Sequence, residues 1–118
     1  MYIYLDDLRA PRTVKDWIIC RNFQEFKSAI KEWGKDANLQ SFPDDLYISF
    51  DHDIDSYNDE GKEETGYDAL KWFVQVLMNN PFKLEFIRDC ITINVHSANP
   101  IGRKNIEAYW ENFIKNIK

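Results

Sequence analysis

Three apolar runs in this sequence each end in ionisable or hydroxyl side chains, and this pattern restricts the folds open to the chain. The runs are 2–5, 46–50 and 91–95, and the residues that follow them are Asp6-Asp7, Asp51-His52-Asp53 and His96-Ser97. Short apolar runs of this kind predict buried strands. In an open parallel sheet the carboxyl ends of the strands meet at a common crevice. We therefore expect these polar residues to form one site.

The rest of the sequence predicts an α/β fold. A further strand is expected at 17–20, and the last apolar run extends back to Cys90. Helices are expected from Asn22 to Gly34, from Thr65 to Asn79, and from Asn99-Pro100 onward. Each helix carries one apolar stripe that needs a sheet to cover it. The order β, β, α, β, α, β, α therefore favours a mainly parallel sheet.

Local signals refine this assignment. Glu25 and Asp68 each stand three residues after a helix cap, as in a capping box. Pro11 marks a turn between the first two strands, where no full helix fits. Segment 38–45 is expected to be a polar loop, and 82–89 is compatible with either a strand or a helical turn.

The composition indicates one domain with a substantial core. The 118 residues are 44% hydrophobic and 15% aromatic, which argues against disorder. A formal net charge of -5 argues against general binding to duplex nucleic acid. Cys20 and Cys90 lack metal-ligand spacing and are expected to be buried, reduced thiols. With no leader or membrane-spanning run in the sequence, we expect a cytoplasmic protein without membrane partners.

The carboxylates at the strand ends suggest a metal site. Asp6, Asp7 and Asp51 together would offer oxygen ligands suited to Mg²⁺ or Mn²⁺, and without a cation they would repel one another. The alternative is that they are solvated turn residues. The acidic segment from Asp51 is not an EF-hand loop, because Ser56 and Lys62 occupy the positions that need Gly and Glu. Residues 55–64 are expected to be a solvated flexible loop, which could close over a ligand.

The two histidines of the chain, His52 and His96, both fall at these strand ends. An imidazole with a near-neutral pKa can accept or donate a proton during phosphoester cleavage, so the pair could divide the base and acid roles. Asp53 would orient an imidazole or join the metal ligands. The alternative is a structural role for each histidine as a hydrogen-bonded cap.

The segment after His96 suggests a phosphate site. Ser97 and Asn99 offer polar groups at a helix N-terminus, where free amides favour an anion, and Arg103 could bind a phosphate oxygen. Arg9 or Arg12 from the first turn could do the same. Asn99-Pro100 is also explained as an ordinary helix start.

Four blocks of the sequence, in order, are similar to those of a known family. They are Leu5-Asp6-Asp7-Leu8-Arg9-Ala10-Pro11, Ser49-Phe50-Asp51-His52-Asp53, Thr65-Gly66-Tyr67-Asp68 and Val95-His96-Ser97-Ala98-Asn99-Pro100-Ile101-Gly102-Arg103. Together they resemble the cyclic-phosphate-processing receiver-like domains, a small bacterial and phage family. This family is a divergent branch of the response-regulator receiver fold, with a proposed role in handling cyclic phosphates of nucleotides or RNA ends.

The resemblance implies a receiver- or flavodoxin-like three-layer α/β sandwich over residues 1–118, with a mainly parallel sheet of about four or five strands. Asp6 and Asp7 would match the acidic pair after the first receiver strand, and Asp51 the carboxylate after the third. The sequence departs from an ordinary receiver in two ways. Its first helix is reduced to a turn, and no clear fifth strand ending in lysine follows Ser97. The missing lysine argues against phospho-aspartate signalling.

These observations lead to one hypothesis with two alternatives. The hypothesis is a metal-assisted phosphoesterase, a hydrolase acting on a small cyclic nucleotide or a cyclic-phosphate RNA end. The first alternative is a module that binds a nucleotide without cleaving it. The second is a degenerate receiver that acts through protein contacts.

Overall fold

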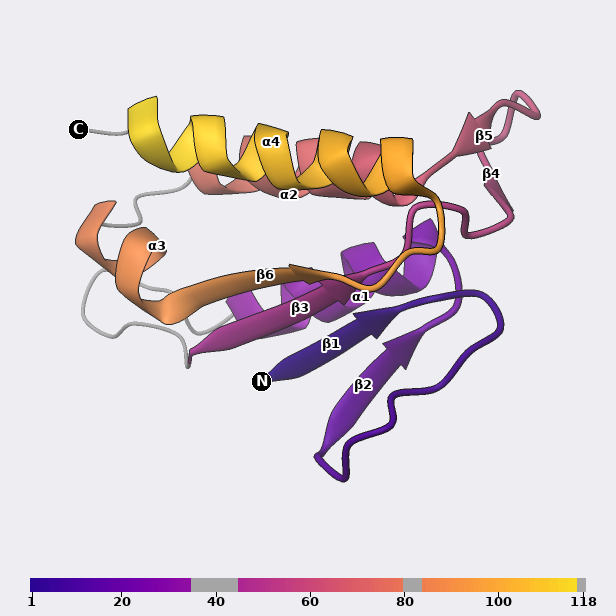
Figure 1. Ribbon diagram of the computed structural model, residues 1–118, viewed down its shortest axis with the longest axis horizontal. Coiled ribbons are helices and arrows are strands. Elements are labelled where there is room, and N and C mark those ends of the chain that lie inside the picture. Colours follow the sequence, from indigo (N-terminus) through magenta and orange to yellow (C-terminus); the bar gives the residue numbers. More distant parts are fainter. Residues whose placement is uncertain (35–44, 80–83, 117–118) are drawn as a thin grey trace.

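The computed structural model describes residues 1–34, 45–79 and 84–116 (Figure 1). The fold is α/β, as expected, with a receiver-like parallel sheet. The elements in chain order are β1 (Tyr2–Leu5), β2 (Trp17–Cys20), α1 (Phe23–Gly34), β3 (Leu46–Phe50), β4 (Ser56–Tyr57), β5 (Glu63–Glu64), α2 (Gly66–Asn79), α3 (Leu84–Cys90), β6 (Ile91–Val95) and α4 (Pro100–Asn116).

The main sheet has the strand order β2-β1-β3-β6, and all neighbouring strands are parallel. Leu5 lies opposite both Cys20 and Phe50, and Phe50 lies opposite Val95. All four strands therefore end in register at one edge of the sheet. This register places the residues that follow β1, β3 and β6 next to one another.

All four helices in the described residues contribute to one hydrophobic core with one face of the sheet, α3 through Ile87. Alternate strand residues point to the same face, and on this face Ile3, Leu5, Ile48 and Phe50 are completely buried. They belong to the same buried cluster as side chains of α1, α2 and α4, including Phe26, Phe73 and Ile106. In Figure 1, α4 lies beside α2 above the sheet.

The opposite face of the sheet carries Tyr2, Tyr4, Trp17, Tyr47, Ser49 and Asn94. In the described residues, segment 6–16 contains no helix, and residues 9–13 of it line a pocket on this face. The Trp17 indole N–H donates to the Thr13 carbonyl at 3.2 Å, and the Lys15 ammonium lies 4.5 Å from the centre of the Tyr2 ring. The absence of a full helix between β1 and β2 is thus confirmed.

Helix caps formed where the sequence predicted them. The Asn22 side chain accepts the Glu25 N–H at 2.9 Å at the start of α1. At the start of α2, Thr65 Oγ1 accepts the Asp68 N–H at 3.2 Å, and Asp68 Oδ2 accepts the Thr65 N–H at 2.9 Å. This reciprocal pair is a complete capping box.

Two segments differ from expectation. Residues 55–64, expected to be a flexible loop, contain the antiparallel pair β4–β5. Its turn is held by the Asn58 side chain, which accepts the N–H groups of Glu60 and Lys62 at 2.9 Å each. Cys90, expected in a strand, ends α3, so β6 begins at Ile91.

Other expectations are partly covered by the described residues. Cys20 is buried and Cys90 half-buried, and both are free thiols. Segment 38–45 falls outside the described residues apart from Asp45, and so do residues 82 and 83. None of the helices in the described ranges combines the length and the apolarity needed to cross a membrane.

Candidate functional site

Backbone hydrogen bonds extend the sheet one residue beyond its strands and fix the polar residues at its edge. The Asp51 N–H donates to the Leu5 carbonyl at 2.9 Å, and the His96 N–H donates to the Phe50 carbonyl at 2.9 Å. Asp6 is held in the same way against β2 at 3.0 Å. The structure thus brings Asp6, Asp51 and His96 together, because each continues a paired strand.

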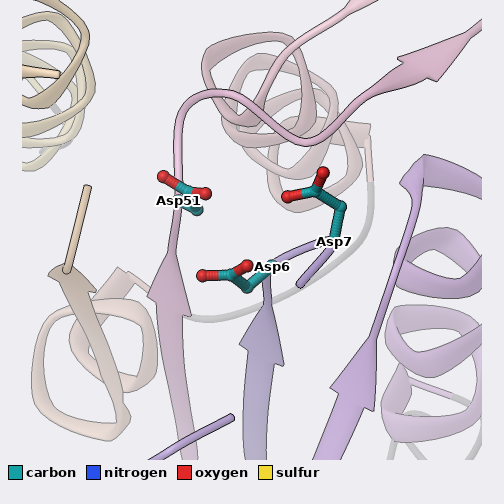
Figure 2. Close-up of side chains that lie close together, drawn as sticks. All are labelled: Asp6, Asp7 and Asp51. Carbon is teal, nitrogen blue, oxygen red and sulfur yellow. The ribbon is translucent and has the colours of Figure 1, made fainter. Parts of the chain in front are cut away.

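The carboxylate cluster consists of Asp6, Asp7 and Asp51. One oxygen from each lies within 4.8 Å of the other two. Figure 2 shows the three side chains around a common space, two from the end of β1 and one from the end of β3. Burial raises the pKa of Asp7, and the negative charges of Asp6 and Asp51 raise it further. Bringing the three carboxylates together therefore costs free energy that a cation would recover.

Asp6 is the most constrained member of this cluster, with only 1% of its surface exposed. Its Oδ1 accepts the N–H groups of Leu8 and Arg9 at 2.9 and 2.8 Å. Its Oδ2 is 3.0 Å from both Arg9 Nε and His96 Nε2. Burial alone would raise the pKa of Asp6, but hydrogen bonds from Arg9, Leu8 and His96 outweigh it and leave the pKa below its ordinary value. Asp6 is therefore ionised at neutral pH.

Arg9 is a cation already present in the cluster. Its Nε lies 3.0 Å from Asp6 Oδ2 and its Nη2 lies 3.4 Å from Asp51 Oδ1. The Arg9 side chain is half exposed, whereas both carboxylates are buried. Its guanidinium therefore bridges two strand ends from the solvent side, where a metal ion or a phosphate would approach.

His96 lies between two polar partners. Its Nε2 is 3.0 Å from Asp6 Oδ2, and its Nδ1 is 2.7 Å from Ser49 Oγ. Asn94 Nδ2 in turn donates to Ser49 Oγ at 3.0 Å. Because ionised Asp6 can only accept, the network assigns the proton to Nε2 and leaves Nδ1 to accept the Ser49 O–H. The Tyr4 ring stacks on the imidazole at 4.2 Å and fixes its plane.

Burial sets the charge of His96. It lowers the pKa of the imidazole, and the neighbouring Asp6 carboxylate offsets this only in part. The ring is therefore neutral at neutral pH, in agreement with the assigned tautomer.

His52 belongs to a second group at the start of α4. Its Nδ1 lies 2.9 Å from Asp53 Oδ1, and Asn99 Nδ2 donates to Asp53 Oδ2 at 3.4 Å. The hydrogen bond to His52 is the main reason that the pKa of Asp53 is lowered. The His52 ring packs so closely on Gly102 that a Cβ at that position would overlap it. His52 joins the carboxylate cluster through its backbone N–H, which donates to Asp51 Oδ1 at 2.9 Å.

The backbone at Asp51 and His52 also contacts the start of α2. The Gly66 N–H donates to the His52 carbonyl at 2.7 Å. A Cβ on Gly66 would overlap the backbone carbonyl of Asp51. This close approach explains why glycine follows Thr65 at the start of the helix.

The residues expected to bind phosphate lie in two places in the structure, at the carboxylate cluster and at the start of α4. Arg9 contacts the carboxylate cluster. Ser97 Oγ accepts the Asn99 N–H at 3.1 Å, and Asn99 Oδ1 accepts the Gly102 N–H at 3.0 Å, so both residues form the cap of α4. Arg103 Nε pairs with Glu107 at 3.2 Å.

Ser49 and Asn94 also belong to the site, although neither was expected there from the sequence. Both lie in strands two positions before a residue of the site, Asp51 and His96 respectively, and alternate strand residues share a face. The signal was a polar residue within a strand, two positions before the polar residue that follows the strand. The same face carries a pocket of about 500 Å³ lined by both residues and by His96.

The donors present fit a hard divalent cation. Carboxylate oxygens from two strand ends are the ligands that Mg²⁺ takes in proteins. Asp7 is half-buried, and its pKa is raised mainly by this burial and further by the negative charges of Asp6 and Asp51. Each Asp6 oxygen already accepts two hydrogen bonds. An ion bound through Asp6 Oδ2 would therefore compete with Arg9 for that oxygen.

Comparison with known protein families gives a match over nearly the whole chain. Residues 1–112 match the family model described as "Cyclic-phosphate processing Receiver domain". The matched range includes the carboxylate cluster, both histidines and the four strands of the main sheet. Searches of curated proteins and of solved structures gave no match.

Proposed function

This chain belongs to the family of cyclic-phosphate processing receiver domains, and on that premise we propose that it is a metal-assisted phosphoesterase acting on a cyclic phosphate of a nucleotide or an RNA end. One observation supports this proposal most. The carboxylate cluster lies within hydrogen-bonding distance of a histidine that is itself oriented on both sides. An ordinary phosphoacceptor site does not need such a histidine.

The proposed reaction is hydrolysis of a cyclic phosphodiester. The oxygen of a water molecule bonds to phosphorus, the bond from phosphorus to one sugar oxygen breaks, and a proton is delivered to that oxygen. A divalent cation held by Asp6, Asp7 and Asp51 would supply charge neutralisation and polarisation of the phosphate. Arg9, whose side chain is half exposed, would bind a nonbridging oxygen, and the exposed Arg12 would assist it.

His96 is proposed as the base. The Ser49 hydroxyl can take a proton from the attacking water while it gives its own proton to His96 Nδ1, since the two atoms are 2.7 Å apart. Ionised Asp6 at Nε2 stabilises the imidazolium that forms. His52, oriented by Asp53, is proposed to donate a proton to the leaving sugar oxygen, and exchange with solvent then restores the protonation of both histidines. Ser97, Asn99 and Arg103 would then contribute at the phosphate from the start of α4.

Phosphorus NMR tests the proposal. Purified protein is incubated with 2',3'- and 3',5'-cyclic nucleotides and Mg²⁺ or Mn²⁺, beside an Asp51→Asn variant that keeps an acceptor for the His52 N–H. We expect a cyclic phosphate resonance to convert to a monoester in the wild type and not in the variant. If the wild type converts none of these compounds with either metal ion, the phosphoesterase proposal is wrong.

Variants of the histidine chain test the mechanism. His96→Ala should lower turnover by about 10²- to 10⁴-fold, as expected for loss of a general base. Ser49→Ala should reduce it in the same direction, because the relay is broken. Circular dichroism checks that both variants fold. Full activity of folded His96→Ala protein would remove His96 from the mechanism.

A second candidate is a module that binds a cyclic nucleotide without cleaving it. It is favoured by the pocket of about 500 Å³ beside His96, which is large enough to hold a nucleotide whether or not cleavage follows. Mass analysis of recovered ligand distinguishes the two candidates. Intact ligand supports capture, and a mass increased by one water supports hydrolysis.

A further inference from the structure

The pocket on the open face of the sheet has the size of a ligand site. Its volume is about 500 Å³, and it lies between the strands and residues 10–13. These residues belong to the first connection, which is segment 6–16 between β1 and β2. Ligand pockets commonly span roughly 300–1,000 Å³. All-parallel sheets usually have both faces covered. Here the first connection covers the second face incompletely and leaves the pocket.

Aromatic rings form one wall of this pocket. The Trp17 indole, from the edge strand β2, makes edge contacts with the rings of Tyr4 at 5.6 Å and Tyr47 at 5.8 Å. The indole N–H is held by the Thr13 carbonyl, which fixes the ring relative to the first connection. All three aromatic residues line the pocket. They therefore present fixed aromatic surface to a ligand.

The other wall is polar and positively charged. Arg9 and Arg12 line the pocket, as do Ser49 and Asn94. Arg9 and His96 line the pocket and also contact Asp6, so these two side chains lie between the pocket and the carboxylate cluster. A fitting ligand thus has an anionic group at one end and a flat aromatic group with hydrogen-bonding edges at the other.

We propose that this pocket binds the base of a nucleotide, with Trp17 and Tyr4 contacting the ring and the phosphate placed at Arg9. This inference rests on the proposed function for the position of the phosphate. It adds the place where the base of the substrate binds, and that a cyclic phosphate without a base is a poor ligand. Charge complementarity at Arg9 and Arg12 and the aromatic wall favour this occupant over an apolar segment of a protein.

Binding of two simple phosphates tests the proposal without requiring turnover. Titration calorimetry compares AMP with ribose 5-phosphate, which lacks the base, for the wild type and for Trp17→Leu. Trp72→Leu is the matched control, because Trp72 is half-buried on the helical side of the sheet. We expect AMP to bind the wild type more tightly than ribose 5-phosphate does. Trp17→Leu should weaken AMP about 5- to 100-fold, as expected for loss of base stacking, and leave ribose 5-phosphate within about 2-fold.

A second variant protects the test against misfolding. Trp17→Phe keeps an aromatic ring and should retain most of the affinity for AMP. Equal binding of AMP and ribose 5-phosphate by the wild type, or no binding of either, would overturn the proposal. An equal loss of affinity for AMP and for ribose 5-phosphate in folded Trp17→Leu protein would also overturn the proposal.

The two proposals fail in different ways. If AMP binding depends on Trp17 but no cyclic nucleotide is hydrolysed, the base site stands and the phosphoesterase is wrong. If glycerol 1,2-cyclic phosphate is hydrolysed as well as 2',3'-cyclic AMP and Trp17→Leu changes neither rate, the phosphoesterase stands and the base site is wrong.

Discussion

Replacing Arg9 should increase the affinity of this protein for a divalent cation. The guanidinium lies 3.0 Å from an Asp6 oxygen and 3.4 Å from an Asp51 oxygen. Both residues belong to the carboxylate cluster that is expected to hold the ion. An ion and Arg9 therefore compete for the same negative charge. Arg9→Met removes the competitor and keeps most of the aliphatic stem.

The size of the effect follows from the two charge pairs. An ion pair with a half-exposed partner contributes about 0.2–1 kcal/mol, so the two together contribute about 0.4–2 kcal/mol. At about 1.4 kcal/mol for each tenfold change, ion affinity should rise about 2- to 30-fold. Arg12→Met is the matched control, because Arg12 is an exposed arginine in the same connection and the charge change is identical. It should raise ion affinity by less than about 2-fold, since exposed charges at a distance are screened by salt.

Titration of Mn²⁺, followed by the electron paramagnetic resonance signal of the free ion, measures these affinities in all three proteins. Thermal unfolding without ions should show Arg9→Met to be less stable than the wild type by about 1 kcal/mol, because its carboxylates lose their partner. Added Mn²⁺ should restore that loss. Equal Mn²⁺ affinities for Arg9→Met and Arg12→Met, or weaker binding by Arg9→Met, would refute the competition.

Three further predictions concern single contacts. Gly102→Ala should destabilise the protein by about 1–3 kcal/mol in urea unfolding, because its Cβ overlaps the His52 side chain; in a His52→Gly background, which removes both the ring and its Cβ from this contact, the cost should fall by about 1 kcal/mol or more, and an equal cost in both backgrounds would contradict this packing. Burial tends to raise the pKa of Asp68, but hydrogen bonds from Thr65 hold it below the ordinary 3.8, so the stabilisation is complete above that pH and is lost as pH falls through the folded-state value. The stability difference between wild type and Asp68→Asn, about 1 kcal/mol at neutral pH, should therefore shrink in acid, and a constant difference down to about pH 2 would argue against the capping box. Burial raises the pKa of Cys20 to about 12, so iodoacetamide should label this thiol only after unfolding; rapid labelling of Cys20 in the native protein, detected by peptide mass, would be inconsistent with its burial.

The polar residues at the carboxyl ends of the strands could be predicted from the sequence, because their positions depend on residues next to them in the chain. A buried strand followed at once by Asp6 or Asp51 places that carboxylate at the carboxyl end of the strand, whatever the rest of the chain does. The Thr65 and Asp68 capping box is equally local. Asp6, Asp51 and His96 could be expected to converge because parallel strands share an edge.

The hydrogen-bond chain from Asn94 through Ser49 to His96 was not predictable in the same way. It depends on the register between β3 and β6, whose paired residues are separated by long stretches of sequence. The β4–β5 pair was missed because its turn is held by the Asn58 side chain and lacks the Asn-Gly or Asp-Gly signal of a two-residue hairpin. The pocket depends on where the first connection lies, which periodicity does not determine because that segment has no regular structure.

The hydrogen bond between Asp6 and His96 joins residues 90 positions apart. β1 is the first strand of the main sheet in sequence and lies inside that sheet, and its neighbour β3 can pair with β6 only after α2 and α3 have been synthesised. Such non-local pairing slows folding, because large loops must close before the contacts form. The complete carboxylate and histidine arrangement should therefore appear only in the last stage of folding. In nascent or partly folded chains the carboxylates would still be far apart. Activity of the site is therefore expected only from protein that has folded completely.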